Sequence, residues 1–196
     1  RMIGSLLEAQ IGVPVPVENR TGGSGVIGHS AIADAAPDGQ TIGVATLEIG
    51  TMHNLGLTDL DYTAYTPLGL YNSDPAAIFV HANSDYADIG ALLTTLEGTA
   101  DGDFKASGSA QGGVNHLALA GMLMAAGMPA GRVAWVPSEG AAPGLQDLAA
   151  GGVEIATASL PEAAALMEAG LIRPLAVFST ARLESAPDVP TFTEAT

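Results

Sequence analysis

The sequence contains no cysteine and only six basic residues among 196. Without cysteine the protein forms no disulfide bond, no thiolate metal site and no cysteine nucleophile. Against the six basic residues stand 21 acidic ones, which gives a formal net charge of −15 at pH 7. Such a surface repels nucleic-acid phosphates, so we expect no nucleic-acid partner and interpret the charge as that of a soluble acidic surface.

Several signatures of membrane insertion and of catalysis are also missing. No apolar run approaches the ~18 residues needed to span a bilayer. The glycine-x-serine-x-glycine turn that holds the nucleophile of many hydrolases does not occur. The four histidines, His29, His53, His81 and His116, lack the spacing of metal ligands and are interpreted as packed or surface residues. We therefore expect no catalytic residue, no metal and no cofactor.

What the sequence does contain is a turn-rich alternation of short apolar runs and segments of helical period, with 25 glycines and 12 prolines. This pattern predicts an α/β fold with a largely parallel sheet or sheets. Strands are expected at 13–17, 41–47, 68–71, 76–80, 104–107, 132–136, 153–158 and 175–178. Helices are expected around 2–9, 26–36, 89–98, 116–126, 141–150 and 160–170, the last opened by the capping box Ser159-Leu160-Pro161-Glu162.

A first glycine-rich segment has two interpretations. Gly23, Gly25 and Gly28 have the spacing of a dinucleotide fingerprint, and Glu48 ends the next predicted strand, where an acid could bind a ribose hydroxyl. This would make the protein an NAD(P)-binding oxidoreductase of the Rossmann type. Against it, the polar residues 18–21 separate the preceding strand from the first glycine, and nothing downstream supplies a hydride-transfer site. The other interpretation is a carboxylate-binding receptor.

A second glycine-rich segment, Ser107 to Asn115, follows a predicted strand and precedes a predicted buried helix. It offers hydroxyl groups and a run of backbone N–H groups at a helix N-terminus, where the helix dipole favours an anion. No basic residue stands in it, so we expect neutral donors to bind an anion that is later released. The alternatives are a glycine-rich turn without a ligand and, for the whole chain, a structural α/β domain that binds nothing.

Six motifs occur along the chain: Val-Glu-Asn-Arg-Thr-Gly-Gly-Ser-Gly (17–25), Ala-Ala-Pro-Asp-Gly-Gln-Thr (35–41), Tyr-Thr-Pro-Leu-Gly (65–69), Ser-Gly-Ser-Ala-Gln-Gly-Gly-Val-Asn-His-Leu (107–117), Val-Pro-Ser-Glu-Gly-Ala-Ala-Pro (136–143) and Pro-Asp-Val-Pro-Thr-Phe (187–192). In this order they resemble the Bug family, the extracytoplasmic solute-binding proteins of tripartite tricarboxylate transporters. The resemblance implies a type II periplasmic-binding-protein fold, with two α/β domains and a ligand cleft between them. It also implies a monomeric periplasmic protein that delivers a small organic acid to membrane permease subunits.

The resemblance also implies which residues bind the ligand. The proposed carboxylate clamp consists of Ser107, Ser109, Ala110, Gln111, Gly112, Gly113 and Val114, and Thr46 and Ser159 are expected to line the site. Two positions depart from the family pattern. Ala110 and Gly113 stand where hydroxyl residues are usual, and Ser138-Glu139 replaces an aromatic residue followed by a base. These departures affect which acid is bound and not the class of ligand.

The expected domain division follows from the same resemblance. Residues 1–74 together with 178–196 are assigned to domain I and residues 75–177 to domain II, with crossings near 73–77 and 174–178. The alignment to the family implies that domain I is incomplete at both ends. Closure of the two domains would bury the ligand between them, and ligand binding would shift the population from the open to the closed form.

Overall fold

The computed structural model describes all residues, 1–196, in two compact units. The first unit is Arg1–Thr66 and the second is Pro67–Thr196.

The second unit is built on one five-stranded sheet with the order β3-β2-β4-β1-β5. Strands β2, β3 and β4 pair in parallel, whereas β1 runs antiparallel to both of its neighbours, β4 and β5. The sheet is therefore mixed, and the expected largely parallel arrangement is correct except for β1. The strands are β1 (Ala76–His81), β2 (Lys105–Ser107), β3 (Ala134–Trp135), β4 (Ile155–Ser159) and β5 (Ile172–Val177).

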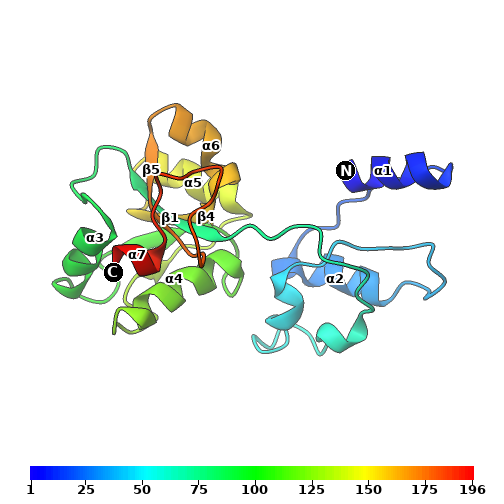
Figure 1. Cartoon of the computed structure of the whole chain (residues 1–196). Helices are drawn as coiled ribbons and strands as arrows, with labels where there is room; N and C mark the ends of the chain where they lie inside the picture. The colour runs from blue at the N-terminus through cyan, green and yellow to red at the C-terminus, as the bar shows by residue number, and fades with distance from the viewer. The chain divides into compact units, whose positions relative to one another are not determined.

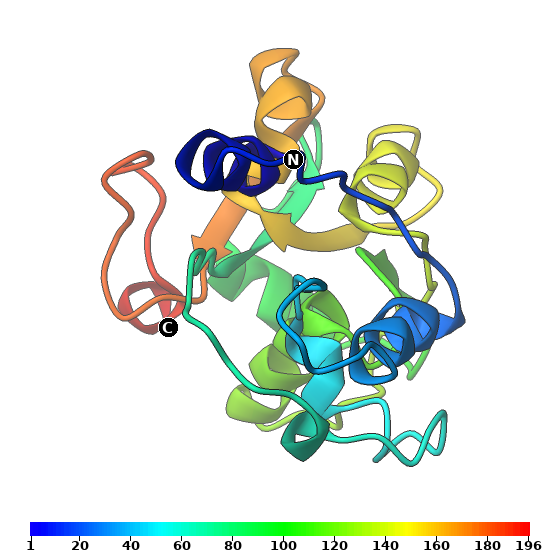
Figure 2. The ribbon, with the colours of Figure 1, turned by 90° about the vertical axis from the view of Figure 1, so that its right-hand side faces the viewer.

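Helices cover both faces of this sheet (Figure 1). α3, α4 and α7 pack on one face and α5 and α6 on the other, and Figure 2 shows α4 and α6 on opposite sides. None of the helices is long and apolar enough to cross a membrane. The helices of the unit are α3 (Ile89–Glu97), α4 (Val114–Ala125), α5 (Ala141–Ala149), α6 (Leu160–Glu168) and α7 (Phe192–Ala195).

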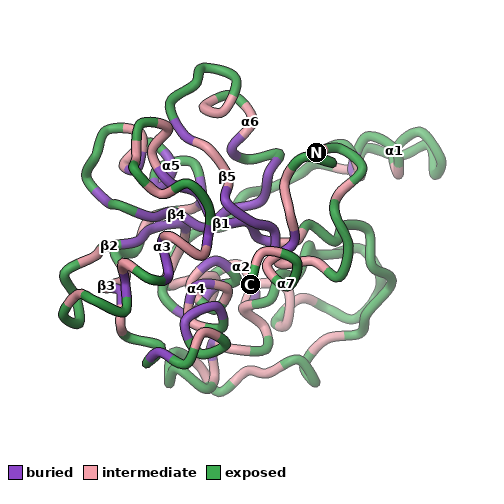
Figure 3. The backbone as a smooth tube through the Cα atoms, turned by 60° about the vertical axis from the view of Figure 1, so that its left-hand side comes forward, coloured by how far each residue is buried: buried purple, intermediate pink, exposed green.

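Alternation along β1 explains the two cores of the second unit. Ile78 and Val80 contribute to one core, and Ala77 and Phe79 contribute to the other, as the two-residue period of a strand requires. All four side chains are completely buried, and Figure 3 shows burial concentrated on the strands and on the inner sides of the helices. A strand buried on both faces is the expected centre of a three-layer α/β fold.

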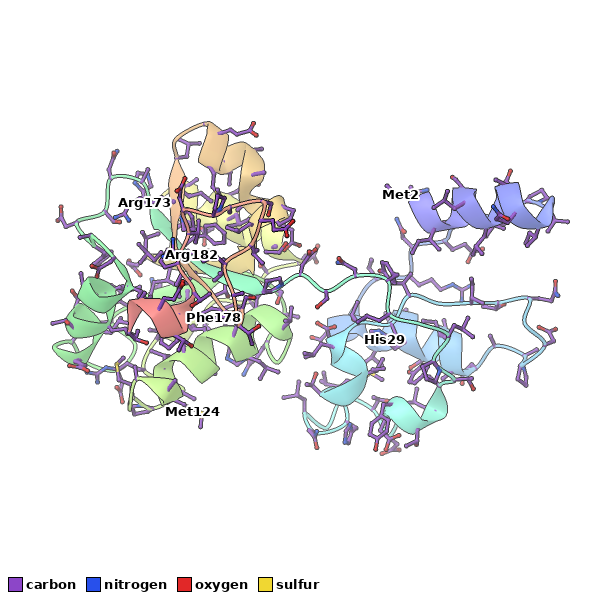
Figure 4. All side chains as sticks on the ribbon, in the orientation of Figure 1. Met2, His29, Met124, Arg173, Phe178 and Arg182 are labelled. Atoms are coloured by element: carbon purple, nitrogen blue, oxygen red, sulfur yellow. The ribbon has the colours of Figure 1, made fainter.

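The first unit has helices and turns but no strand. Its elements are α1 (Met2–Ile11), the single turn η1 (Gly23–Gly25), α2 (Val26–Ala33) and the turns η2 (Leu47–Gly50) and η3 (Tyr62–Ala64). Only Gly4, His29 and Met52 are buried in it, and Figure 4 labels His29 on α2. Many of its apolar side chains, Ile42 and Val44 among them, are half exposed or more.

The strands predicted at 13–17, 41–47 and 68–71 are wrong for this structure. Their sequences alternate as strands do, but a strand exists only where a neighbour completes its hydrogen bonds. Here the Val15 N–H donates to the carboxylate of Glu8 on α1, 3.2 Å away, rather than to a neighbouring strand. The other five predicted strands and all the predicted helices are present, with ends shifted by a few residues.

Residues 178–196 pack on the second unit in this structure. Val177 and Thr191 form a parallel bridge, and the Phe178 and Phe192 rings lie 5.7 Å apart, as Figure 4 shows for Phe178 beside α7. The first compact unit ends at Thr66 and the second begins at Pro67, and the predicted domain boundary at residue 74 stays a prediction. The assignment of 178–196 to domain I of a two-domain receptor stays a prediction.

Candidate functional site

Four strands of the second unit, β2, β3, β4 and β5, end at the same edge of the sheet. Because β2, β3 and β4 are parallel, the loops that follow them, 108–113 and 136–140, and the start of α6 lie at their carboxyl ends. Ligands of open α/β sheets bind at this kind of edge. We call it the carboxyl edge of the second unit.

The two loops at the carboxyl edge are tied to each other by hydrogen bonds. The Ser107 hydroxyl donates to the Val136 carbonyl at 2.8 Å, and the Ser138 N–H donates to the Ser109 carbonyl at 3.2 Å. Ser107 is buried, so the bond to Val136 satisfies a hydroxyl that water does not reach. Ser107 therefore positions the loops, and its hydroxyl proton is already used in the hydrogen bond to Val136.

Tight packing fixes the end of β2 against its neighbours. A Cβ placed on Gly108 would lie 2.2 Å from the Thr157 carbonyl oxygen of β4. One placed on Gly144 of α5 would lie 2.7 Å from the Gly108 nitrogen. Neither position accepts a side chain unless the backbone shifts, so these glycines allow α5 and β4 to approach the loop.

The helices that begin at the carboxyl edge differ in their caps. α4 begins after Gly113 and α5 after Gly140, and neither has a side-chain cap. By contrast, α3 is capped by Asp88, while α6 and α7 begin with capping boxes, the first of which confirms the predicted Ser159–Glu162 motif. The first amides of a helix need acceptors from outside it. Helices α4 and α5 therefore leave donors that an anion can satisfy.

Of the three serines predicted for the site, Ser109 is the one with an unoccupied hydroxyl. Its Oγ is buried and has no hydrogen-bond partner. The Ser159 hydroxyl lies 3.0 Å from the Glu162 carboxylate and donates to it, and Ser107 donates to Val136. A buried hydroxyl without a partner is disfavoured unless something else bonds to it. Ser109 is thus the side chain best placed to donate to a ligand.

Two of the predicted backbone donors are already engaged. The Gly113 N–H donates to the Ala110 carbonyl at 3.1 Å, and the Gly112 N–H donates to Nδ1 of His116 at 3.0 Å. Gly112 has φ +79°, a left-handed conformation that glycine adopts without strain. Ala110, Gln111 and Val114 remain as backbone donors, so Gly112 and Gly113 shape the loop.

Thr46 lies in the first unit, in a different environment. Its N–H donates to Nε2 of the buried His29 at 3.3 Å, and its hydroxyl donates to the Glu48 carboxylate. Nδ1 of His29 donates to the Gly25 carbonyl at 2.8 Å. These bonds join the first glycine-rich turn to the segment at Thr46, and they engage Glu48, the acid that the dinucleotide interpretation assigned to a ribose.

The sequence interpretation missed His116 and Trp135. The two rings pack with centroids 4.9 Å apart, and burial lowers the pKa of His116 below its ordinary value. His116 is the third residue of α4, the position from which a side chain reaches back to the turn before a helix. That position was a usable signal, but histidine is an unusual residue there.

The arginines of the second unit bond to groups outside loops 108–113 and 136–140. Arg132 bonds carbonyl groups at the end of α3, Arg173 bonds segment 82–86, and Arg182 pairs with a carboxylate of α7. Lys105 begins β2 at the opposite end of the strand. An anion at the carboxyl edge would therefore be bound by neutral hydroxyl and amide donors.

A comparison with known families assigns the whole chain to one of them. The family model described as "Tripartite tricarboxylate transporter family receptor" matches residues 1–196. The chain belongs to this family. Membership confirms the resemblance found in the sequence and makes the protein a member of a family of solute-binding receptors.

Curated relatives match over the whole chain. It is 30% identical over 198 residues to a UPF0065 protein encoded in the tcbD-tcbE intergenic region of a Pseudomonas species, covering 100% of the chain and 57% of the relative. It is 26% identical over 198 residues to Protein BugT of Bordetella pertussis, covering 99% and 60%. The chain thus spans little more than half the length of these relatives.

Solved structures show the same fold. A structure described as a periplasmic transporter superposes with a TM-score of 0.86 at 28% identity, covering 100% of this chain and 65% of that one. An R. palustris protein solved with adipate superposes with a TM-score of 0.79 at 28% identity, covering 100% and 65%. The expected fold class, α/β of the periplasmic-binding-protein kind, is confirmed.

Proposed function

We propose that this protein is an extracytoplasmic solute-binding protein that captures a small mono-, di- or tricarboxylate and delivers it to the membrane subunits of a tripartite tricarboxylate-type transporter. It acts as a receptor and not as an enzyme, and it works as a monomer in the periplasm. The observation that carries the proposal is the set of unpaired neutral donors at the carboxyl edge, in a chain that belongs to a receptor family.

The binding step follows from the geometry of that edge. A ligand carboxylate accepts hydrogen bonds from the Ser109 hydroxyl and from the free amides at the starts of α4 and α5. The dipoles of both helices favour its negative charge. Hydrogen bonds to a charged acceptor contribute about 1.5–3 kcal/mol each, so three or four of them are enough for selective binding.

The absence of a cation among these donors suits a delivery protein. A buried ion pair with arginine would hold the carboxylate in a way that is hard to reverse, because separating the pair leaves a charge without a partner. Neutral amides and a hydroxyl return to water at lower cost when the ligand leaves. The arginines of the second unit bond to carbonyl and carboxylate groups outside loops 108–113 and 136–140.

The choice of probe comes from the related structure solved with adipate. Adipate is a dicarboxylate, and its neutral diamide, adipamide, has the same chain length without charge. A carboxylate site distinguishes the two, whereas a site for an aliphatic chain does not.

Thermal denaturation tests the proposal. Adipate at ~100 times its dissociation constant should add about 2.7 kcal/mol of stability, which raises the Tm of a protein of this size by roughly 5–10 °C. Adipamide and NAD at the same concentration should leave the Tm unchanged. A Tm shift with NAD and none with a panel of organic acids would overturn the receptor interpretation and favour the oxidoreductase interpretation.

A further inference from the structure

His116 occupies a defined place behind the loop at 108–113. Its Nδ1 accepts a hydrogen bond from the Gly112 N–H at 3.0 Å. Its ring packs on that of Trp135, at the end of β3, with centroids 4.9 Å apart and planes tilted by 42°. The hydrogen bond holds the loop and the contact with Trp135 holds the imidazole ring, so the histidine links the loop after β2 to the end of β3.

We propose that His116 is a positioning residue of the ligand site, whose neutral Nδ1 holds the Gly112 N–H and so keeps loop 108–113 in the shape that binds a carboxylate. The inference rests on the proposed function, because this loop is the one proposed to hold the ligand. It assigns to His116 a role in binding without contact to the ligand.

The conformation of Gly112 explains why the loop needs an acceptor at this point. The residue is buried and has φ +79°, and its N–H is directed to Nδ1 of His116 on α4. A buried N–H without an acceptor is strongly disfavoured. Without the imidazole, Gly112 would rotate to find another acceptor, and Ala110 and Gln111 would move with it.

The hydrogen bond requires the uncharged ring. Nδ1 accepts when the proton is on Nε2, whereas in the imidazolium both nitrogens carry protons and Nδ1 would face the Gly112 N–H as a second donor. Burial lowers the pKa of His116 below its ordinary value of 6.5. The ring is therefore neutral at pH 7 and becomes charged only below pH 6.5. Ligand affinity should therefore fall on acidification.

Few charged groups surround this ring. Loop 108–113, α4 and β3 bring no other titratable side chain to it, and the nearest one along the loop after β3 is the exposed Glu139. Lys105 is the first residue of β2 and Arg132 comes before β3, both at the opposite edge of the sheet. Burial is therefore the cause of the lowered pKa of His116.

Two substitutions separate the effect of the Nδ1 acceptor from the effect of the charge on the protonated ring. His116→Asn keeps an acceptor oxygen close to the place of Nδ1 and does not titrate. His116→Leu fills similar volume and has no acceptor. Calorimetry with adipate at pH 7.0 should give the Asn variant an affinity within about threefold of the wild type and the Leu variant an affinity about tenfold lower.

The same titrations at pH 5.0 test the sign of the pH dependence. The wild type should lose affinity relative to His116→Asn, which corrects for protonation of adipate itself. Unchanged affinity of His116→Leu at pH 7.0, or a relative gain by the wild type at pH 5.0, would overturn the inference and leave the proposed function standing. Failure of the wild type to bind any carboxylate would overturn both.

Fluorescence of the ligand-free protein tests the contact separately, because Trp135 is the one tryptophan of the chain. A charged imidazole quenches an adjacent indole more than a neutral one does. The wild type should show a fluorescence transition with a midpoint below pH 6.5 that His116→Asn lacks. If His116→Leu fails to fold, this titration and the Asn variant still decide, and a transition that persists in His116→Asn overturns the proposed contact.

Discussion

The molecule has two glycine-rich turns that lead into helices. A histidine of each helix forms a hydrogen bond to the turn before it, but one histidine donates and the other accepts. In the first unit, Nδ1 of His29 donates to the Gly25 carbonyl at 2.8 Å, which engages an acceptor of the turn. In the second unit, Nδ1 of His116 accepts from the Gly112 N–H at 3.0 Å, which engages a donor. Similar sequences therefore give two different hydrogen-bonding arrangements.

The support of the two turns differs even more. The turn at 108–113 follows β2, a strand of a five-stranded sheet, and is bonded to the loop after β3. The turn at 22–25 follows a segment that forms no strand, and Ser24 in it has φ +53°. A glycine pattern alone does not specify a binding site. The strand in front of the turn and the partners of its amides determine whether donors are free for a ligand.

The largest expected effect concerns the packing that supports the second turn. Gly108→Ala places a Cβ 2.2 Å from the Thr157 carbonyl oxygen, so β4 or the loop must move. We expect a loss of about 2–3 kcal/mol of stability, measured by chemical denaturation. Gly121→Ala in α4 is the matched control, because nothing lies within 4 Å of its Cβ, and it should stabilise the protein by up to ~1 kcal/mol. Equal stability of the two variants would contradict the close packing.

The next effect compares the backbone conformations of the two turns. Gly112 and Gly23 both have positive φ, +79° and +57°, so valine is strained at either position. Gly112→Val should reduce adipate affinity by about tenfold or more, whereas Gly23→Val should affect the first unit alone and leave affinity nearly unchanged. The reverse order of affinities would move the ligand to the first turn.

A third prediction separates two serines of one loop. Ser109→Ala removes the hydroxyl that has no partner and should weaken adipate binding by roughly tenfold without loss of stability. Ser107→Ala removes the bond to Val136 and should lower stability by about 1 kcal/mol, with a smaller effect on affinity. Calorimetry gives the adipate affinity of each variant, and chemical denaturation gives its stability. Wild-type affinity in Ser109→Ala would exclude its hydroxyl from the site.

These serines show what the sequence could and could not predict. The order Ser107-Gly108-Ser109 after an apolar strand was sufficient to locate the loop, because strand and helix periods are local properties. Which hydroxyl remains free depends on Val136, which is 29 residues away and reaches Ser107 only when β2 pairs with β3. The sequence therefore predicted the loop but not the roles within it.

The fold shows the same distinction between local and distant information. The apolar run of β1 and the i, i+3, i+4, i+7 spacing of α3 predict elements that the structure confirms. The direction of β1, antiparallel to β4 and β5, depends on its pairing and was not predicted. Segments 13–17 and 41–47 have the alternation of strands, but the structure gives them no strand partner.

The smallest expected effect concerns charge. With a net charge of −15 and no arginine bonded to loops 108–113 or 136–140, the protein repels a dicarboxylate weakly at long range. Raising the salt concentration from 0.05 to 0.5 M should increase adipate affinity slightly, by no more than about twofold, because salt screens this repulsion. Calorimetry at each salt concentration measures the affinity. A large decrease with salt would indicate that an arginine or lysine pairs with the ligand.

The central claim is that the turn at 108–113, and not the turn at 22–25, presents free donors to a carboxylate. Backbone amide NMR during an adipate titration tests it most directly, because amides that donate to an anion shift strongly. We expect the largest shifts at the amides of Ala110, Gln111 and Val114 and of the first residues of α5, with saturation at one ligand per protein. Shifts concentrated on Gly22–Val26, with the amides of 109–114 unchanged, would contradict it.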